Sequence, residues 1–293
     1  MLSILIPTKD YNCCALVKNL HQQAEALGIA YEIIVGEDGS SPQGLALNSQ
    51  LTELPNCRII AMAQNVGRSH IRNILAQEAR GKDIMFIDSD AMVQREDILQ
   101  QHIKTLEENC VVCGGLYHPA AQPDNDCSLR YRYEKEADKH RSAAKRNETP
   151  YDKFTTFSFA IRRELFLSIK FDERIKNYGY EDTLFGYELR KRGVKIMHID
   201  APLMHVGLES NNHYLAKVEE SLRTLAKLES TIESTTLLKC YNRLKRLHLT
   251  GLIAALWSVS TPLMRKNLLG RHPSLTMLNI YKIGYYCKIK RGL

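Results

Sequence analysis

The sequence predicts an α/β fold built on a mainly parallel, doubly wound sheet. Short apolar runs of strand length alternate with longer segments of helical periodicity between residues 2 and 117, which is the order expected of such folds. Polar clusters follow the apolar runs. With 293 residues and 44% hydrophobic content, the chain can bury a full core as one large domain, or as one domain with a smaller appendage.

Five apolar runs have the composition of buried strands. Each is rich in large apolar or β-branched residues, and most are followed closely by glycine, asparagine or aspartate, which end strands. A run that is apolar throughout, such as IMFI, is typical of a strand covered on both faces. The expected strands lie at residues 2–8, 57–63, 83–90 and 110–117, and a further strand begins at residue 31 and ends in the turn GEDGSS.

Segments with a period of 3.6 residues separate these strands. In the first of them, Leu16, Leu20 and Ala24 share one helical face, and Gly28 ends the segment, as expected of a helix that packs on a sheet. Strands that alternate with helices form a mainly parallel sheet with helices on both faces. The expected helices lie at residues 15–28, 68–81 and 95–109.

The polar clusters fall at the carboxyl ends of the expected strands, where ligands of such sheets bind. The first strand ends in PTKDYN, without the Gly-x-Gly-x-x-Gly turn of a dinucleotide site, which argues against a nicotinamide or flavin enzyme. The second ends at Asp38, which is able to accept a ring N–H, although Asp-Gly is also an ordinary turn. Arg68 and Arg72 follow the third, one helical turn apart, either as solvated arginines or as partners of an anionic ligand.

Two carboxylates end the apolar run of the fourth strand. If the strand continues to its predicted end, Asp88 and Asp90 point to the same side, about 6 to 7 Å apart. Such a pair is costly unless a cation lies beside it. Mg2+ and Mn2+ prefer oxygen ligands and are commonly held by carboxylates together with substrate phosphates. The sequence therefore predicts a divalent metal that carries a diphosphate at Asp88 and Asp90.

The C-terminal part of the chain is strongly basic. Residues 239–293 carry eleven Lys and Arg and no Asp or Glu, whereas the other 238 residues carry 29 basic against 33 acidic residues, a net of −4. Basic appendages bind nucleic acid or anionic membranes, and no nucleic-acid reader motif is present. We therefore expect peripheral membrane contact and no nucleic acid. The uncharged stretch Leu249–Met264 is a core helix, an interfacial membrane helix or a membrane span.

Cysteine usage and the N-terminal residues give an expectation about location. The eight cysteines show no repeating spacing, and no signal sequence precedes the first strand. Both features are typical of free thiols in a reducing cytoplasm. Cys110 and Cys113 have no second pair at zinc spacing, so we expect them to pack within their strand.

Six motifs occur in order along the chain: ILIPTKDYN, EDGSS, NVGRSHIRN, FIDSD, NYGYEDTLFGYELRKRG and MHVG. Together they resemble the family 2 glycosyltransferases of the GT-A (nucleotide-diphospho-sugar transferase) fold, which are inverting enzymes with nucleotide-sugar donors. The resemblance implies a catalytic domain at residues 1–210, with a donor-binding half at 1–118 and an acceptor-binding, catalytic half at 119–210. Residues 211–293 would form a helical, basic extension.

The resemblance also implies roles for the matching positions. Asp182 would be the base that removes the acceptor hydroxyl proton, and Glu181 would support it or bind the acceptor. The metal, Mn2+ or Mg2+, would be held by Asp88, Asp90 and His205. The nucleotide-sugar would be bound by Pro7, Thr8, Asp38, Arg68, Arg72, Asp88 and Ser89. Two positions depart from the pattern, because the second acid of the base-binding pair is Glu37 and Ala91 stands where many relatives keep an acid.

Structural readings of the same residues stay open. An acidic first turn is stabilised by the helix dipole, so Glu181 and Asp182 also have a purely structural interpretation. A single histidine after a strand, such as His205, is often a packed residue, and we expect His198 to be one. Residues 128–148 are highly charged and form either a solvated helix or a lid on the acceptor side.

The function expected from the resemblance is an inverting, metal-dependent hexosyl- or N-acetylhexosaminyl-transfer. The donor would be a UDP-sugar, and the acceptor a glycan or lipid-linked glycan in surface-polysaccharide synthesis at the inner face of a bacterial membrane. One alternative is a nucleotidyltransferase, against which the missing glycine-rich loop after the first strand argues. The other is a noncatalytic sugar-binding protein, against which the retained acids argue.

Overall fold

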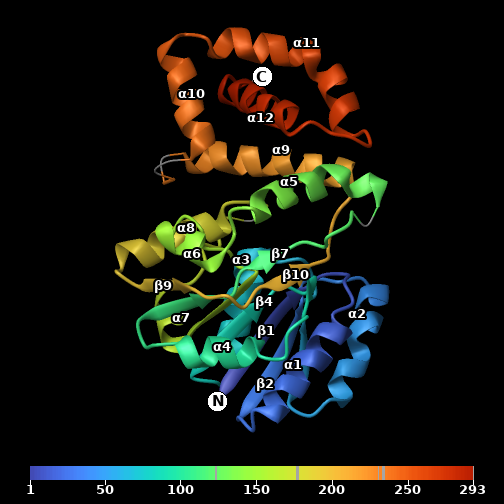
Figure 1. Cartoon of the computed structure of the whole chain (residues 1–293), viewed down its shortest axis with the longest axis vertical. Coiled ribbons are helices and arrows are strands. Elements are labelled where there is room, and N and C mark those ends of the chain that lie inside the picture. Colours follow the sequence, from blue (N-terminus) through green and yellow to red (C-terminus); the bar gives the residue numbers. More distant parts are fainter. Residues whose placement is uncertain (123, 176–177, 230, 233–234, 293) are drawn as a thin grey trace. The chain divides into compact units, whose positions relative to one another are not determined.

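The computed structural model describes the chain except residues 123, 176–177, 230, 233–234 and 293 (Figure 1). The described residues form two compact units. The first consists of Met1–His118, Asp138–Lys176 and Glu181–Gly207, and the second of Pro119–Ala137, Asn177–Tyr180 and Leu208–Leu293. The last boundary lies close to the expected one after residue 210, but residues 119–137 join the C-terminal unit. The functional labels given to the predicted domains stay predictions.

A seven-stranded sheet forms the centre of the first unit, in the order β3-β2-β1-β4-β8-β6-β9. All neighbouring strands are parallel except β8, which is antiparallel to both β4 and β6. The predicted α/β fold with a mainly parallel sheet is therefore confirmed. The strands are β1 Leu2–Thr8, β2 Tyr31–Glu37, β3 Cys57–Ala61, β4 Asp83–Ile87, β6 Cys110–Cys113, β8 Ser158–Arg162 and β9 Lys195–His198.

Helices cover both faces of this sheet. Successive strand residues point to opposite sides, and the apolar side chains on each face need a packing partner. Ile4 and Ile6 of β1 belong to one core cluster together with Leu20, whereas Leu5 belongs to a second cluster with Leu75. The strands therefore need apolar residues at nearly every position, as their sequences have. The helices of this unit are α1 Cys14–Ala26, α2 Pro42–Asn48, α3 Arg68–Glu78, α4 Ile98–Thr105, α6 Ala143–Glu148, α7 Arg163–Ile169 and α8 Glu181–Lys191.

A second, three-stranded sheet has the order β5-β10-β7, from Ala91–Met92, Leu203–His205 and Leu116–Tyr117. Here the prediction of a strand as far as residue 90 is wrong, because β4 ends at Ile87. The amide of Ala91 donates to the carbonyl of Asp88 at 3.1 Å, and this turn redirects the chain into β5. Asp88 and Asp90 therefore do not lie in one extended strand. Instead, β5 pairs with β10, with Ala91 opposite His205.

Residues 128–148 form two helices, α5 Ser128–Asp138 and α6, rather than the single solvated helix that we considered. The side chain of Arg146 is buried and donates to the carbonyls of Cys113, Gly114 and Ile199 at 3.2, 3.1 and 2.8 Å. A Cβ on Gly115 would lie 2.6 Å from the Arg146 guanidinium, so the glycine leaves room for it. Arg146 thus satisfies backbone carbonyls at the ends of β6 and β9. The role of α5 and α6 as a lid on the acceptor side stays a prediction.

The second unit is helical, with α9 Asn211–Leu228, α10 Thr236–Arg246, α11 Thr250–Leu268 and α12 Leu275–Lys290. Helices α11 and α12 approach closely, because a Cβ on Gly284 would lie 2.4 Å from Trp257. In the described part of the chain, no single helix is long and apolar enough to cross a membrane. Helices α10 and α11 meet that criterion only as a pair, and they are bent by 116°.

All eight cysteines are free, and Cys110 and Cys113 are buried in β6. The prediction that this pair packs in its strand is confirmed. His198 is also buried and contacts Arg146 at 2.8 Å, in agreement with the packing role expected for it.

The contacts of Arg146 lead to a prediction about stability. Arg146→Met keeps much of the apolar stem but removes the donor from the Gly114 and Ile199 carbonyls, so we expect the free energy of unfolding to fall by about 3 kcal/mol. Lys145→Met is the matched control, because Lys145 is exposed and its ion pair is with exposed Glu148, a contact worth at most about 0.5 kcal/mol. Urea unfolding of both variants measures the difference, and equal midpoints would contradict the assignment.

Candidate active site

The candidate site lies at the carboxyl edge of the parallel strands. Thr8 ends β1, and the chain after β2 turns at Asp38, whose amide donates to the Thr8 carbonyl at 2.8 Å. The Asp38 carboxylate accepts the amides of Val66 at 2.6 Å and of Gly67 at 3.2 Å. Asp38 therefore fixes the loop that leads into α3. Contact with a nucleotide base stays a prediction, for which each carboxylate oxygen keeps a further lone pair.

Glu37, which stands in the place of the expected second acid, is fully buried. Its carboxylate accepts Asn48 Nδ2 at 2.7 Å and Ser40 Oγ at 2.5 Å. Because both of its oxygens have internal partners, Glu37 holds the loop after β2 together. Pro7 and Ser89 are only partly buried, at the ends of β1 and β4, and their donor contacts stay predictions.

The two arginines of α3 have different surroundings. Arg72 is buried and lies 2.5 Å from Asp88 Oδ1, and its guanidinium is 5.9 Å from the centre of the Phe171 ring. Burial raises the pKa of Asp88, and the charge of Arg72 acts in the opposite direction. Arg68, in contrast, is half exposed and lies 3.7 Å from Glu181. Arg72 thus braces the end of β4, while Arg68 lies at the rim of the site.

Asp90 and His205 lie side by side, as the pairing of β5 with β10 requires. Asp90 Oδ2 is 2.9 Å from His205 Nε2, and the amide of Val206 donates to the Asp90 carbonyl at 3.1 Å. A Cβ on Gly207 would lie 2.3 Å from Asp90 Oδ2, so only glycine allows this approach of the chain. Burial alone would raise the pKa of Asp90, but the hydrogen bond and charge of His205 hold the pKa below its ordinary value.

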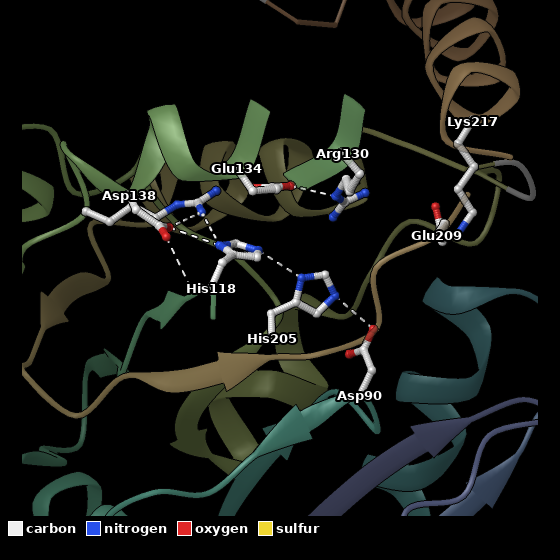
Figure 2. A network of polar contacts seen from close by, with 9 residues as sticks. Asp90, His118, Arg130, Glu134, Asp138, His205, Glu209 and Lys217 are labelled. Atoms are coloured by element: carbon white, nitrogen blue, oxygen red, sulfur yellow. Dashed lines mark hydrogen bonds and ion pairs between the residues drawn. The ribbon is translucent and has the colours of Figure 1, made fainter. Parts of the chain in front are cut away.

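A chain of polar contacts continues from His205 into the protein (Figure 2). His205 Nδ1 lies 3.0 Å from Nε2 of buried His118, and His118 Nδ1 lies 3.0 Å from Asp138 Oδ1. The Asp138 carboxylate also accepts the His118 amide at 3.1 Å and Arg141 Nη1 at 2.9 Å. Asp138, His118, His205 and Asp90 therefore form one continuous series of contacts.

Our reasoning from the sequence missed His118 and Asp138. His118 directly follows β7, which pairs with β10 so that Tyr117 lies opposite Met204. The next residues along the two strands are His118 and His205, and this register brings their rings together. The sequence signal was weak, since it consisted of one histidine after a two-residue strand.

Glu181 and Asp182 open α8. Glu181 is buried, and Asp182 is partly buried and accepts the amide of Thr183 at 2.7 Å. Loss of hydration and the neighbouring Glu181 charge raise the pKa of Asp182 to about 6. A carboxylate that served only to stabilise the helix end would have a lowered pKa. A carboxylate with a pKa near the working pH is suited to accept a proton, and the role of Asp182 as the base stays a prediction.

Acidic groups from separate segments gather around Arg68. Its guanidinium lies 3.7 Å from Glu181 at the start of α8, and its positive charge favours the ionised forms of Asp88, Asp90 and Asp182, although it is not the largest influence on the pKa of any of them. The turn after β4 and the start of α8 are therefore brought to one region of the first unit. Asn177, which begins the motif that contains Glu181, lies outside the described residues.

The three residues predicted to bind metal are not equivalent. No group of three or more His, Cys, Asp or Glu side chains is arranged to hold a metal ion in the chain outside the seven undescribed positions. Asp90 and His205 meet, whereas Asp88 faces Arg72. Asp88 therefore pairs with Arg72 rather than with the Asp90 and His205 pair, and its role as a metal ligand stays a prediction.

Comparison with known proteins supports the fold. A family model described as Glycosyl transferase family 2 matches residues 3–169. The uncharacterized glycosyltransferase YfnE of Bacillus subtilis (strain 168) is 37% identical over 87 residues, which are 29% of this chain and 22% of YfnE. The match thus spans less than a quarter of that protein.

Solved structures share the fold at low sequence identity. The mannosyltransferase PcManGT from Pyrobaculum calidifontis, in complex with GDP-Man and Mn2+, aligns with a TM-score of 0.58 at 13% identity, over 98% of this chain and 84% of that one. Residues 1–349 of S. aureus TarS align with a TM-score of 0.53 at 17% identity, and the alignment covers 100% of this chain and 92% of the TarS chain. Against the longer TarS chain, 84% of this chain aligns with 42% of that one, at a TM-score of 0.53 and 18% identity.

The environment of Asp182 leads to a prediction about its ionisation. Because the Glu181 charge helps to raise the pKa of Asp182, Glu181→Gln should move it from about 6 toward the ordinary 3.8. Glu188→Gln, on the same helix and paired with Lys191, should leave it unchanged. Carbon NMR titration of labelled aspartate carboxyl groups measures both. An Asp182 pKa that stays near 6 in the Glu181 variant would exclude the coupling.

Proposed function

Since the chain belongs to glycosyl transferase family 2, we propose that it transfers a sugar from a nucleotide-sugar to a hydroxyl acceptor, with inversion and with a divalent metal. The observation that carries the proposal is the contact of Arg68 with Glu181 at 3.7 Å, next to Asp182, whose pKa is raised to about 6. A group that offsets diphosphate charge and a carboxylate with a raised pKa are the two parts that such a displacement needs.

Asp90 and His205 fit a divalent metal. Their facing atoms, Asp90 Oδ2 and His205 Nε2, lie 2.9 Å apart, so both side chains could contact one ion. Carboxylate and imidazole are both ordinary ligands of such ions, and substrate phosphates commonly complete the set. When bound, the metal would neutralise charge that develops on the leaving diphosphate. The Mn2+ in the PcManGT complex supports Mn2+ as the ion to test.

His118 and Asp138 are positioning residues for His205 in this proposal. An ionised Asp138 only accepts hydrogen bonds, so His118 Nδ1 must donate to it across the 3.0 Å contact. In neutral His118, Nε2 then accepts the Nδ1 proton of His205. Nε2 of His205 shares its proton with Asp90 in the absence of metal, and once that proton is lost the Nε2 lone pair would be free for a metal ion. Buried partners that fix the tautomer of a ligating histidine are usual in metal sites.

Asp182 would accept the proton of the acceptor hydroxyl. As the acceptor oxygen bonds to the anomeric carbon, the bond from that carbon to the diphosphate oxygen breaks, and the hydroxyl proton passes to the Asp182 carboxylate. The pKa of about 6 keeps Asp182 mostly ionised at neutral pH and still basic. Glu181 would support this role through its charge, and half-exposed Arg68, 3.7 Å from Glu181, would meet the donor diphosphate.

The donor, acceptor and location are finer parts of the proposal. The sequence favours a UDP-sugar, while PcManGT holds GDP-Man, so both nucleotides belong in an assay. We propose a glycan or lipid-linked glycan as acceptor, in surface-polysaccharide synthesis at the inner face of the membrane. The absence of Asp and Glu from residues 239–293 supports a location near anionic lipid. The noncatalytic alternative predicts donor binding without turnover.

The central test of this function is transfer or donor hydrolysis by the purified protein with Mn2+ and a panel of nucleotide sugars. Asp182→Asn should lower kcat by 100- to 10,000-fold, while donor affinity stays near wild type and the melting temperature does not fall, since the ionised carboxylate with a raised pKa does not stabilise the fold at neutral pH. The wild-type rate should fall as pH drops below about 6, since protonated Asp182 cannot accept a proton. Asp152→Asn, at an exposed pair with Arg190, is the control. Near-normal kcat in folded Asp182→Asn protein would exclude the base assignment.

Metal binding tests the positioning role directly, without substrate. Asp90→Ala should abolish Mn2+ binding, and His118→Gln or Asp138→Asn should weaken it by about 10- to 100-fold. Calorimetry or the EPR signal of free Mn2+ gives the affinity, and the nitrogen shifts of His205 report its tautomer. His102→Gln is the control, because His102 is buried but bonds to the Ile98 carbonyl. Wild-type affinity and an unchanged His205 tautomer in the His118 variant would refute the role.

A further inference from the structure

Helix α11 of the second unit exposes an apolar stripe to solvent. Leu252, Leu256, Val259 and Leu263 have relative exposures of 56%, 57%, 82% and 73%. Eight of the fourteen large apolar side chains that are exposed in the described part of the chain lie between residues 247 and 280. Single exposed apolar residues are common, but a contiguous set indicates an interaction site.

The spacing of these residues places them on one face of the helix. At about 100° per residue, Leu252, Leu256, Val259 and Leu263 fall within a sector of about 60°. The buried residues of α11 are Ala254, Trp257, Met264 and Leu268, and their sector is centred roughly 150° away. Packing inside the second unit therefore buries one apolar side of α11, while the apolar residues on the other side contact solvent.

Basic residues flank the stripe along the chain. Arg243, Lys245 and Arg246 are exposed in the last turn of α10, which runs into α11, and Lys266 and Arg271 are exposed at the other end. No Asp or Glu occurs from residue 239 onward. An apolar helix face bordered by Lys and Arg is typical of helices that lie in the plane of a membrane interface.

We propose that the exposed face of α11 inserts into the interface of an anionic lipid bilayer, with the flanking basic residues against the headgroups. Charge selects this partner over a second copy of the chain, because two such faces would bring together basic residues with no acidic residue from 239 onward to offset them. Residues 239–293 carry eleven positive charges, and each one near an anionic leaflet adds about fivefold to the partition coefficient.

The helix is suited to lying in the interface. Ser258, Ser260 and Thr261 fall within it, and their hydroxyl groups donate to backbone carbonyls one turn earlier. The sharp bend of 116° between α10 and α11 sets the basic last turn of α10 at an angle to the stripe. The apolar face is about three turns long, from Leu252 to Leu263, which is ample for partial burial among lipid headgroups.

Cosedimentation of the full-length protein with vesicles tests the apolar part. We expect binding to vesicles of phosphatidylglycerol and phosphatidylcholine, and little binding to phosphatidylcholine alone. The double variant Val259→Ser, Leu263→Ser should lower the partition coefficient at least tenfold, since each Leu or Val withdrawn from water contributes about that much. Its melting temperature should not change, because both side chains are exposed. Leu45→Ser, Leu47→Ser is the control, as both are exposed on α2.

Charge is tested with a second pair of variants. Arg243→Gln, Arg246→Gln should weaken binding to anionic vesicles about 30-fold at low salt, and added salt should weaken wild-type binding steeply. Lys104→Gln, Lys153→Gln, exposed in the first unit, should have little effect. Equal binding to neutral and anionic vesicles would overturn the proposal, and so would wild-type binding by the Val259 and Leu263 variant. A concentration-dependent dimer that this variant abolishes, without vesicle binding, would assign the face to a second copy instead.

Discussion

The site depends on the antiparallel pairing of β5 with β10. Both strands are very short, yet their register sets Ala91 opposite His205 and so joins segments that are more than a hundred residues apart. Asp90 precedes one strand residue and His205 is the other, and their side chains meet at 2.9 Å. Gly207 follows closely enough that any Cβ would collide with Asp90. Loss of this pairing would separate the carboxylate from the imidazole and remove the metal site that we propose.

The acidic groups of the site have different neighbours and therefore different properties. Arg72 forms an ion pair with Asp88 at 2.5 Å, whereas Asp90 is the carboxylate that contacts His205. His205 keeps the pKa of Asp90 low, while lost hydration and Glu181 raise that of Asp182 to about 6. Carboxylates of one site whose surroundings push their pKa values apart are suited to different tasks. Here one would bind a cation and the other would accept a proton.

The second unit shows how a helix can be apolar on two sides for different reasons. Trp257 packs closely against Gly284 of α12, and this contact fixes which side of α11 is buried. The hydropathy of residues 249–264 alone cannot distinguish that side from the exposed side with Val259, because both are apolar. The packing of α12 against Trp257 shows that the face with Val259 stays exposed. The basic residues beside that face then indicate an anionic partner.

The sequence alone determined the layered α/β fold, because apolar runs alternate with helical periods and local composition carries that signal. It also indicated the carboxyl edge of the sheet, and its resemblance to a known family pointed to Glu181, Asp182 and His205. It could not determine that the chain turns after Ile87 or that Arg72 takes Asp88. Nor could it bring His118 and Asp138 to His205. Those outcomes depend on strand register and on side chains from distant segments, and such contacts form only when the whole sheet assembles.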